Sequence, residues 1–275
     1  MWYLLALSLS ALQFNKKLSV VLLIVTTAIA EYTRIIDVRA LTFLGILVII
    51  TVIHINFSSK SKILSIMLEI LLLLMSVGLM LHVIPGFHNP IILDNVRAGP
   101  ESRPFSMYYN FDKALIPFVL IICMKSLFRT DKPVPNRLWY WLALAIAVPG
   151  LLLIAVASGG LKIEIHHPTW LFQFILANIF FVSLAEEALF RGYLQQRFSS
   201  VMPPVLALII ASLLFGILHY AGGSLLVIFS TLAGLIYGLA WMLSGRLWVA
   251  VLFHVSLNLC HLLFFTYPAF QHLSF

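Results

Sequence analysis

The sequence contains few charged residues, and this shortage excludes a soluble protein. Asp, Glu, Lys and Arg make up 10% of its 275 residues, whereas 62% are hydrophobic and the mean hydropathy is +1.05. Soluble globular domains contain about 25% charged residues. Soluble dinucleotide-binding enzymes, β-sandwiches, disordered linkers and nucleic-acid-binding domains are therefore excluded, because each needs a polar surface. The composition instead predicts an all-α, polytopic bundle of helices in a membrane.

Cysteine is equally scarce. The two cysteines, Cys123 and Cys260, both lie inside apolar runs, so the chain can form neither a disulfide framework nor a Cys-rich metal site. Internal repeats and soluble domains are absent as well. We therefore expect one helical membrane domain, with an N-terminal transmembrane region at 1–137 and a C-terminal core at 138–275.

Apolar runs long enough to cross a bilayer recur along the chain. A span needs about 20 apolar residues, and the clear candidates are 40–57, 63–83, 114–128, 138–157, 170–190, 203–220, 224–243 and 246–265. Two shorter runs, 2–14 and 18–30, are marginal and also suit a tight hairpin, one broken span or interfacial helices. We therefore expect eight to ten transmembrane helices. No basic residue precedes 2–14, unlike in a secretory signal, so we expect it to be a retained segment that faces outside.

The 17 Lys and Arg residues outnumber the 10 Asp and Glu residues and lie mostly in the connections between apolar runs. There we expect contacts with anionic lipid headgroups and none with nucleic acid. Cytoplasmic connections are enriched in Lys and Arg. Because successive connections lie on opposite sides of the membrane, alternate connections form two sets. The larger set, expected to be cytoplasmic, contains Lys16, Lys17, Lys60, Lys62, Lys125, Arg129, Lys132, Arg137, Arg197 and Arg246. The smaller set, expected outside together with the C-terminus, is Arg34, Arg39, Arg97, Arg103, Lys113 and Lys162. We expect the bacterial cytoplasmic (inner) membrane; the oligomeric state stays open.

One connection is longer than the others and spans residues 84–113. It contains Pro85-Gly86 and Gly99-Pro100, and Asn110-Phe111-Asp112-Lys113 leads into the next apolar run. Long loops in compact proteins are often lids or binding elements. An ordinary exposed loop with a helix cap at Asn110 is the simpler interpretation, and the sequence slightly favours it.

Three ionisable residues lie inside the otherwise apolar run 170–190 or at its end: Glu186, Glu187 and Arg191. Ionisable groups at bilayer depth are costly and are therefore functional candidates. Glu187 and Arg191 are spaced i, i+4, at which a carboxylate and a guanidinium pair on a helix. Adjacent helical residues point about 100° apart, so Glu186 is free for a different role. A purely structural ion-pair cluster is the alternative.

Two later runs contribute polar residues at similar depth. His219 ends one run, and His254 and Asn258 lie i, i+4 in the last one. At about 1.5 Å of rise per residue, Glu186 and these three residues fall between about 12 and 24 Å from the cytoplasmic helix ends. They can therefore meet. The set suits a hydrolase without a nucleophilic side chain, in which a carboxylate deprotonates water and nearby donors hold the oxyanion.

Zinc is the alternative for the same residues. Glu186, His219 and His254 would be three protein ligands, with water in the fourth position. Neither His-Glu-x-x-His nor its inverted form occurs, which weakens this alternative. The sequence alone therefore predicts no specific cofactor, and zinc stays an alternative.

Three motifs occur in order on successive predicted helices: Glu186-Glu187-x-x-x-Arg191, Phe215-x-x-x-His219 and His254-x-x-x-Asn258. Together they resemble the motifs of the CPBP (Abi) family, which includes the type 2 CAAX prenyl proteases and is also called the glutamic-type intramembrane proteases. The resemblance covers roughly residues 170–265.

This resemblance implies an intramembrane endopeptidase acting on a membrane-associated protein or peptide. Glu186 would activate water with His219, while His254 and Asn258 would form the oxyanion site. Glu187 and Arg191 would support the geometry, and Phe215 is either plain packing or a wall of the site. A prenylated C-terminal tail, a peptide pheromone or bacteriocin precursor, and a protein with a C-terminal sorting helix all suit such a site as substrates.

Two other functions are compatible with the sequence. The first is a non-catalytic immunity or adaptor protein of the same fold that binds a peptide without cutting it. The second is a proton-coupled transporter that uses Glu69, although no second half mirrors it. Further polar residues in apolar runs are His54 and His261, whereas His166-His167 with Glu164 is expected to be solvent-exposed. Gly234 and Gly238, spaced i, i+4, predict a close helix contact.

Overall fold

The computed structural model describes residues 1–57, 59–130, 133 and 137–271. The N-terminal half contains α1 (Trp2–Ala11), α2 (Lys16–Tyr32), α3 (Val38–Phe57), α4 (Lys62–Met80), β1 (Ile91–Val96), β2 (Phe105–Tyr108), α5 (Phe111–Ala114) and α6 (Ile116–Cys123). The C-terminal half contains α7 (Leu138–Ala157), α8 (Leu171–Leu176), η1 (Ala177–Ser183), α9 (Leu184–Glu187), η2 (Ala188–Gln195), α10 (Gln196–Ser199), α11 (Pro204–Ile217), η3 (Tyr220–Gly222), α12 (Ser224–Ser244) and α13 (Leu247–Phe264). The predicted all-α class is confirmed.

Six helices of the described residues are long and apolar enough to cross a membrane. They are α3, α4, α7, the continuous helix Leu171–Ser199, α12 and α13. The expected span 203–220 and the marginal run 2–14 form the shorter apolar helices α11 and α1, and the marginal run 18–30 lies within the 17-residue α2. The protein is therefore a multi-pass integral membrane protein. One hydrophobic core includes residues from Leu5 to Phe265, and the region boundary at residue 137 stays a prediction.

The expected span 114–128 is wrong. Helix α6 has only eight residues and ends where Met124 adopts an extended conformation. Ile116 and Leu120 of this helix are fully buried by protein, as is Leu127 beyond it, whereas residues 121–123 are half-buried. The run is apolar because it packs in the core against α4 and η2, so hydropathy alone did not distinguish a core segment from a lipid-facing one.

Local side-chain chemistry explains where several helices begin. The Asn15 side chain accepts a hydrogen bond from the Leu18 N–H at 3.0 Å and caps α2. The Ser61 hydroxyl accepts one from the Leu64 N–H at 3.3 Å and caps α4. Each satisfies a main-chain donor that the first helical turn leaves free. The polar connections of the sequence therefore also set the starts of these helices.

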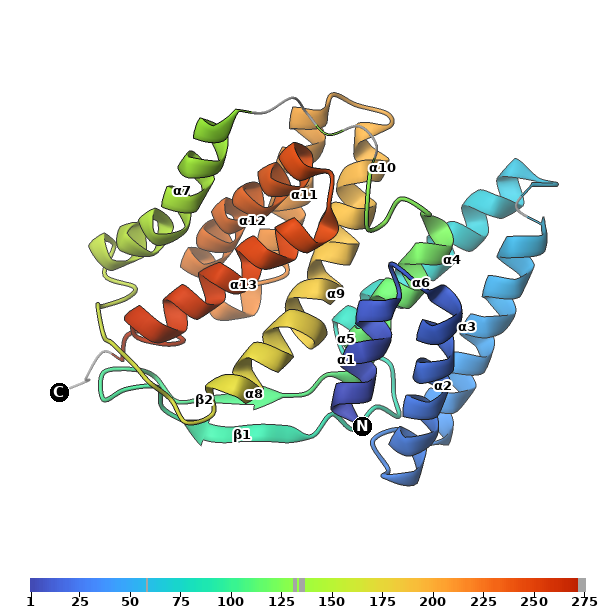
Figure 1. The fold of residues 1–275 in the computed structure, drawn as a ribbon, viewed down its shortest axis with the longest axis horizontal. Coiled ribbons are helices and arrows are strands. Elements are labelled where there is room, and N and C mark those ends of the chain that lie inside the picture. The colour runs from blue at the N-terminus through green and yellow to red at the C-terminus, as the bar shows by residue number, and fades with distance from the viewer. Residues whose placement is uncertain (58, 131–132, 134–136, 272–275) are drawn as a thin grey trace.

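The helix Leu171–Ser199, called the long helix below, has 29 residues and runs through the middle of the molecule (Figure 1). Helices α1–α4 lie on one side of it, and α7, α12 and α13 lie on the other. Two π-helical segments, η1 and η2, flank the single α-helical turn α9. Such wide turns occur frequently at functional sites.

The long connection forms a β-hairpin. Strands β1 and β2 pair antiparallel, with Ile91 opposite Tyr108 and Val96 opposite Phe105. The hairpin runs beneath the lower ends of α8 and α1 in Figure 1. After β2 the chain enters α5, where Asn110 occupies the N-cap position without a side-chain capping bond. The connection is therefore ordered and leads directly to the centre of the molecule.

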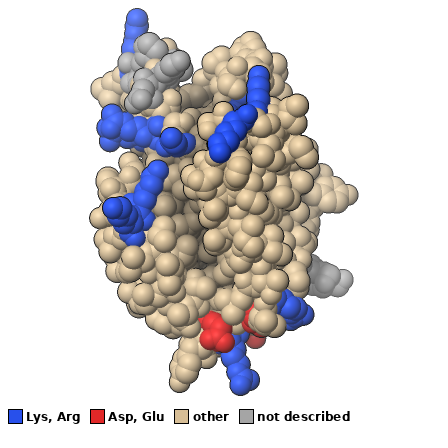
Figure 2. Space-filling model, turned by 90° about the vertical axis from the view of Figure 1, so that its right-hand side faces the viewer, with Lys and Arg blue, Asp and Glu red and all other residues tan. Residues whose placement is uncertain are grey.

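Charged residues gather at the two ends of the molecule. On the face shown in Figure 2, most Lys and Arg residues lie toward the upper end, the acidic residues lie at the lower end, and much of the surface between them is uncharged. This distribution is what a membrane protein with a cytoplasmic excess of basic residues is expected to have. Lys132, one of the residues assigned to the cytoplasmic set, lies outside the described residues. The absolute orientation stays a prediction.

The prediction that His166 is solvent-exposed is wrong, whereas His167 is exposed. The His166 ring is buried, and its Nδ1 donates to the Leu262 carbonyl at 2.6 Å. Its Nε2 lies 2.9 Å from Glu164 Oε2. The Glu164 carboxylate also accepts from the Glu101 N–H at 2.9 Å and from the Ser102 hydroxyl at 2.7 Å. Sequence could not reveal this cluster because its members come from separate connections.

The Glu164 cluster predicts a local response to acid. Burial raises the pKa of Glu164, but the bonds from Glu101, Ser102 and His166 outweigh it, so the pKa lies below its ordinary 4.5. A carboxyl with a lowered folded-state pKa stabilises the fold above its unfolded pKa, and this stabilisation is lost as pH falls through the folded value. Because Ser102 Oγ also accepts from the Tyr267 N–H, we expect acid below pH 4.5 to speed hydrogen exchange at Tyr267, corrected for the intrinsic rate.

The matched control is Glu164→Gln. It should show fast exchange at Tyr267 at neutral pH and little further change in acid, because the titrating group is gone. Equal protection of Tyr267 in the wild type at about pH 3 and about pH 7 would contradict the assignment.

Candidate active site

Glu187 and Arg191 form a fully buried ion pair on the long helix. Arg191 Nη1 donates to Glu187 Oε1 at 3.1 Å, and both side chains have 0% exposure. The i, i+4 pairing predicted from the sequence is confirmed. The guanidinium also lies over the Phe215 ring, 4.5 Å from its centroid. Since an unpaired buried charge is strongly unfavourable, the pair fixes both side chains in one arrangement.

Main-chain carbonyls of α12 accept hydrogen bonds from side chains of the long helix. Arg191 Nη2 donates to the Gly234 carbonyl at 2.9 Å, and Gln195 Nε2 donates to the Gly238 carbonyl at 3.1 Å. A Cβ at Gly234 would lie 3.0 Å from Arg191 Nη2. A Cβ at Gly238 would overlap the Leu208 side chain of α11. The predicted close contact at these glycines is therefore confirmed, and they face both α11 and the long helix.

His254 of α13 is held by the same carboxylate. Its Nδ1 lies 2.8 Å from Glu187 Oε1, and its ring stacks on Tyr237 with centroids 4.5 Å apart. Because the Glu187 carboxylate accepts, Nδ1 carries the proton. Nε2 then points away from Glu187, and no side chain or main-chain group of the described residues bonds it. His254 is thereby oriented with one nitrogen available to a substrate.

His219 lies just past the end of α11 and is half-buried. Its Nδ1 lies 2.8 Å from the Phe215 carbonyl, which can only accept, so Nδ1–H is the donor and Nε2 is free to accept a proton. The Phe215 ring lies between the two imidazoles, 4.8 Å from His219 and 5.8 Å from His254 by centroids. Phe215 thus packs against both histidines.

Asn258 of α13 is oriented by a second amide. Its Nδ2 donates to Asn178 Oδ1 at 2.8 Å, and Asn178 Nδ2 donates to the Phe174 carbonyl at 3.0 Å. The second N–H of Asn258 remains available. Sequence reasoning missed Asn178, although an amide in the middle of the apolar run 170–190 was a signal that could have drawn attention to it.

Glu186 faces elsewhere, as predicted from its position beside Glu187. Its side chain is 10% exposed, and Lys113 Nζ of α5 lies 3.4 Å from its Oε1. It also interacts electrostatically with His254 and His219. The structure therefore gathers Glu186, His219 and His254 around one site, and it adds Lys113, which the sequence placed in an outer connection.

The zinc alternative has no preformed site among the described residues. No group of three or more His, Cys, Asp or Glu side chains is arranged to hold a metal ion within the ranges 1–57, 59–130 and 137–271. His219 and His254 each bond protein through Nδ1, and Glu186 bonds Lys113. The mechanism proposed below is written for the side chains of this protein alone.

Of the other polar residues in apolar runs, Glu69 and His261 bond groups outside the candidate site. Glu69 of α4 accepts from the Tyr193 hydroxyl at 2.6 Å and from Arg197 Nε at 2.7 Å. His261 Nε2 lies 3.1 Å from the Thr266 carbonyl. His54 is buried on α3. Glu69 thus joins the N-terminal helices to the long helix, which is a structural role.

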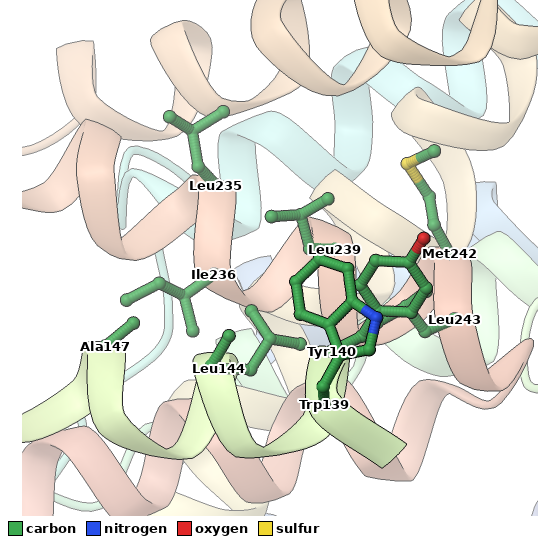
Figure 3. A pocket seen from close by; sticks show the side chains of 10 residues that line it. Trp139, Tyr140, Leu144, Ala147, Leu235, Ile236, Leu239, Met242 and Leu243 are labelled. Atoms are coloured by element: carbon green, nitrogen blue, oxygen red, sulfur yellow. The ribbon is translucent and has the colours of Figure 1, made fainter. Parts of the chain in front are cut away.

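An apolar pocket of about 510 Å³ lies between α7 and α12 (Figure 3). Its lining includes Trp139, Tyr140, Leu144, Ile236 and Met242. None of the acidic or histidine residues of the candidate site lines it. It is therefore separate from the polar site.

One family model matches the part of the chain that contains this site. Residues 168–260 match the family model described as Rce1-like, type II CAAX prenyl endopeptidase Rce1-like. No curated protein and no solved structure matches the chain. The matched segment contains Glu186, His219, His254 and Asn258, but not Lys113. The predicted resemblance is therefore confirmed for residues 168–260, which are similar to the CAAX prenyl endopeptidases of this family model.

Proposed function

We propose that this protein is an intramembrane endopeptidase that hydrolyses a peptide bond of a membrane-associated protein or peptide. The observation that supports this best is the position of Glu186. It is a carboxylate buried inside a membrane-spanning helix, beside two imidazoles whose Nδ1 atoms are already committed. A general base needs such a placement next to groups that can bind water and stabilise charge.

In the proposed mechanism, Glu186 takes a proton from a water molecule that also bonds His219 Nε2. The water oxygen attacks the carbonyl carbon, and the C=O electron pair moves onto the oxygen. The free N–H of Asn258 and the Nε2–H of a protonated His254 stabilise this oxyanion. When the intermediate collapses, the C–N bond breaks and Glu186 passes its proton to the leaving amine.

Glu187 has a separate role in this mechanism. Its carboxylate holds His254 through Nδ1 and thereby orients the Nε2 atom that the proposed oxyanion site uses. Arg191 keeps Glu187 in place from the opposite side. In this mechanism Glu186 therefore activates the water, and Glu187 contributes to charge stabilisation through His254.

The substrate is proposed from the site's location in the membrane. A prenylated C-terminal tail agrees with the description of the matched family. A peptide precursor or a protein with a C-terminal membrane helix would reach the same site. All three keep the scissile bond near the bilayer.

The test compares protein termini in cells that express equal amounts of wild type or Glu186→Gln. Gln preserves the shape but cannot accept the proton, so a new terminus formed by the wild type should fall by about 10²–10⁴-fold. Mass spectrometry of total protein termini measures it. Identical termini, with a phenotype that survives the substitution, would contradict the peptidase and favour a peptide-binding protein of the same fold.

A further inference from the structure

Lys113 approaches the candidate base from outside the segment that matches the family. Its Nζ lies 3.4 Å from Glu186 Oε1, and the two side chains are 15% and 10% exposed. Lys113 is part of α5, at the end of the long connection, whereas Glu186 is part of α9. The two elements are therefore joined by an ion pair that is largely removed from solvent.

The main chain at Lys113 is held rigidly by its neighbour. Asp112, with a side chain 2% exposed, lies 2.6 Å from His82 Nδ1 through its Oδ2 and accepts from Asn89 Nδ2 at 2.9 Å. Its Oδ1 also accepts from the Lys113 N–H at 2.8 Å. The Phe111 N–H donates to Asn89 Oδ1 at 2.8 Å. Such a network leaves little freedom for α5 to move relative to the loop at residues 82–89.

Few other charges act on Glu186. Of the elements packed against α9, α6 carries no charged side chain, and α13 contributes His254. His219 also interacts with Glu186, and the nearby Glu187 and Arg191 pair with each other. Lys113 is thus the basic side chain that bonds Glu186 directly.

We propose that Lys113 is a positioning residue that holds the Glu186 side chain in its ionised form and in its working orientation, with Asp112 as its anchor. A cation at this distance favours a carboxylate, whereas burial alone favours the neutral acid. A protonated Glu186 could not accept a proton from water. The N-terminal region thereby completes the site of residues 168–260. This inference deepens the proposed function and rests on it for its catalytic consequence.

A substrate-binding role is the competing explanation for Lys113. A lysine that binds an anionic group of the substrate changes KM, whereas one that positions the base changes kcat. The ratio of the two effects therefore separates the explanations.

The first experiment measures Glu186 without any substrate. Dicyclohexylcarbodiimide modifies protonated carboxyl groups within membranes, and mass spectrometry locates the modified residue. At neutral pH we expect at least about fivefold more modification of Glu186 in Lys113→Met than in wild type, because the uncompensated buried carboxyl takes up a proton. Lys113→Arg should behave as wild type, since it retains the charge. Lys162→Met is the matched control, because Lys162 pairs with Glu101 at 2.9 Å instead of Glu186.

The second experiment measures kinetics with a quenched-fluorescence peptide that spans the cleavage site found by the terminus comparison. Lys113→Met should lower kcat by about 10- to 100-fold with KM nearly unchanged. Lys113→Arg should recover most of this loss, and Lys162→Met should show none. Asp112→Asn should give a smaller decrease in kcat, because it loosens the anchor and leaves the cation.

The outcomes separate this inference from the proposed function. Equal modification of Glu186 in wild type and Lys113→Met would overturn the inference, whatever the enzyme does. A raised KM with unchanged kcat would overturn it in favour of substrate binding. If Glu186→Gln leaves the termini unchanged while Lys113→Met increases modification, the proposed function fails and only the electrostatic pairing stands.

Discussion

Replacing Arg191 with methionine is expected to lower the free energy of unfolding by about 3–5 kcal/mol. The guanidinium is fully buried, pairs with Glu187 at 3.1 Å and donates to the Gly234 carbonyl. Methionine fills a similar volume but leaves the Glu187 carboxylate in an apolar core with only His254 as a partner. Reversible unfolding in mixed micelles, titrated with a denaturing detergent, measures the change.

The double variant Glu187→Gln/Arg191→Met is the control for this prediction. It removes both charges, so it should be clearly more stable than Arg191→Met alone, because no uncompensated carboxylate remains. If the single and the double variant were equally unstable, the loss would come from packing around Phe215 and not from an unpaired charge. The double variant should still lack activity, since His254 loses its carboxylate.

Replacing Asn258 with leucine is expected to lower kcat by about 10²–10³-fold, with a much smaller change in KM. Asn258 donates one N–H to Asn178, and in the proposed mechanism its second N–H donates to the developing oxyanion. Such a bond strengthens only as the carbonyl oxygen gains charge, so it acts on the transition state. Steady-state kinetics with the cleavage-site peptide measures both constants.

Asn56→Leu is the matched control, because Asn56 is an exposed amide on α3 that donates to the Val52 carbonyl at 2.8 Å. It should retain wild-type kinetics. Asn178→Ala should give an intermediate loss, since Asn178 orients Asn258 but does not reach the substrate. A rise in KM for Asn258→Leu with unchanged kcat would instead mean that Asn258 binds the ground state of the substrate.

Local patterns allowed much of the C-terminal half to be predicted. The spacing of Glu187 and Arg191 determined their pairing, because residues i and i+4 are neighbours on a helix whatever surrounds them. The different directions of Glu186 and Glu187 followed from the same geometry. The glycines of α12 indicated a close contact, but not that Arg191 and Gln195 would bond their carbonyls.

The errors have a common physical cause in tertiary structure. The segment 114–128 is as apolar as a span, but its residues are buried by α4 and η2 instead of by lipid. Lys113 looked like an ordinary loop charge, because only the folded hairpin brings it to Glu186. Similarly, His166 is polar and lies in a connection, yet Leu262 and Glu164 enclose it. Most of these partners are distant in the sequence, so local spacing could not predict the contacts.

The bonds from Arg191 and Gln195 to the carbonyls of Gly234 and Gly238 also define how α12 is aligned along the long helix. A shift of α12 by one turn, about 5.4 Å, would place Gly238 opposite Arg191 but Met242 opposite Gln195. A shift in the other direction would place Ser230 opposite Arg191. In both cases a side chain would occupy the space that a glycine now leaves open. The two glycines therefore favour the present alignment, and sliding α12 along the long helix would break both bonds.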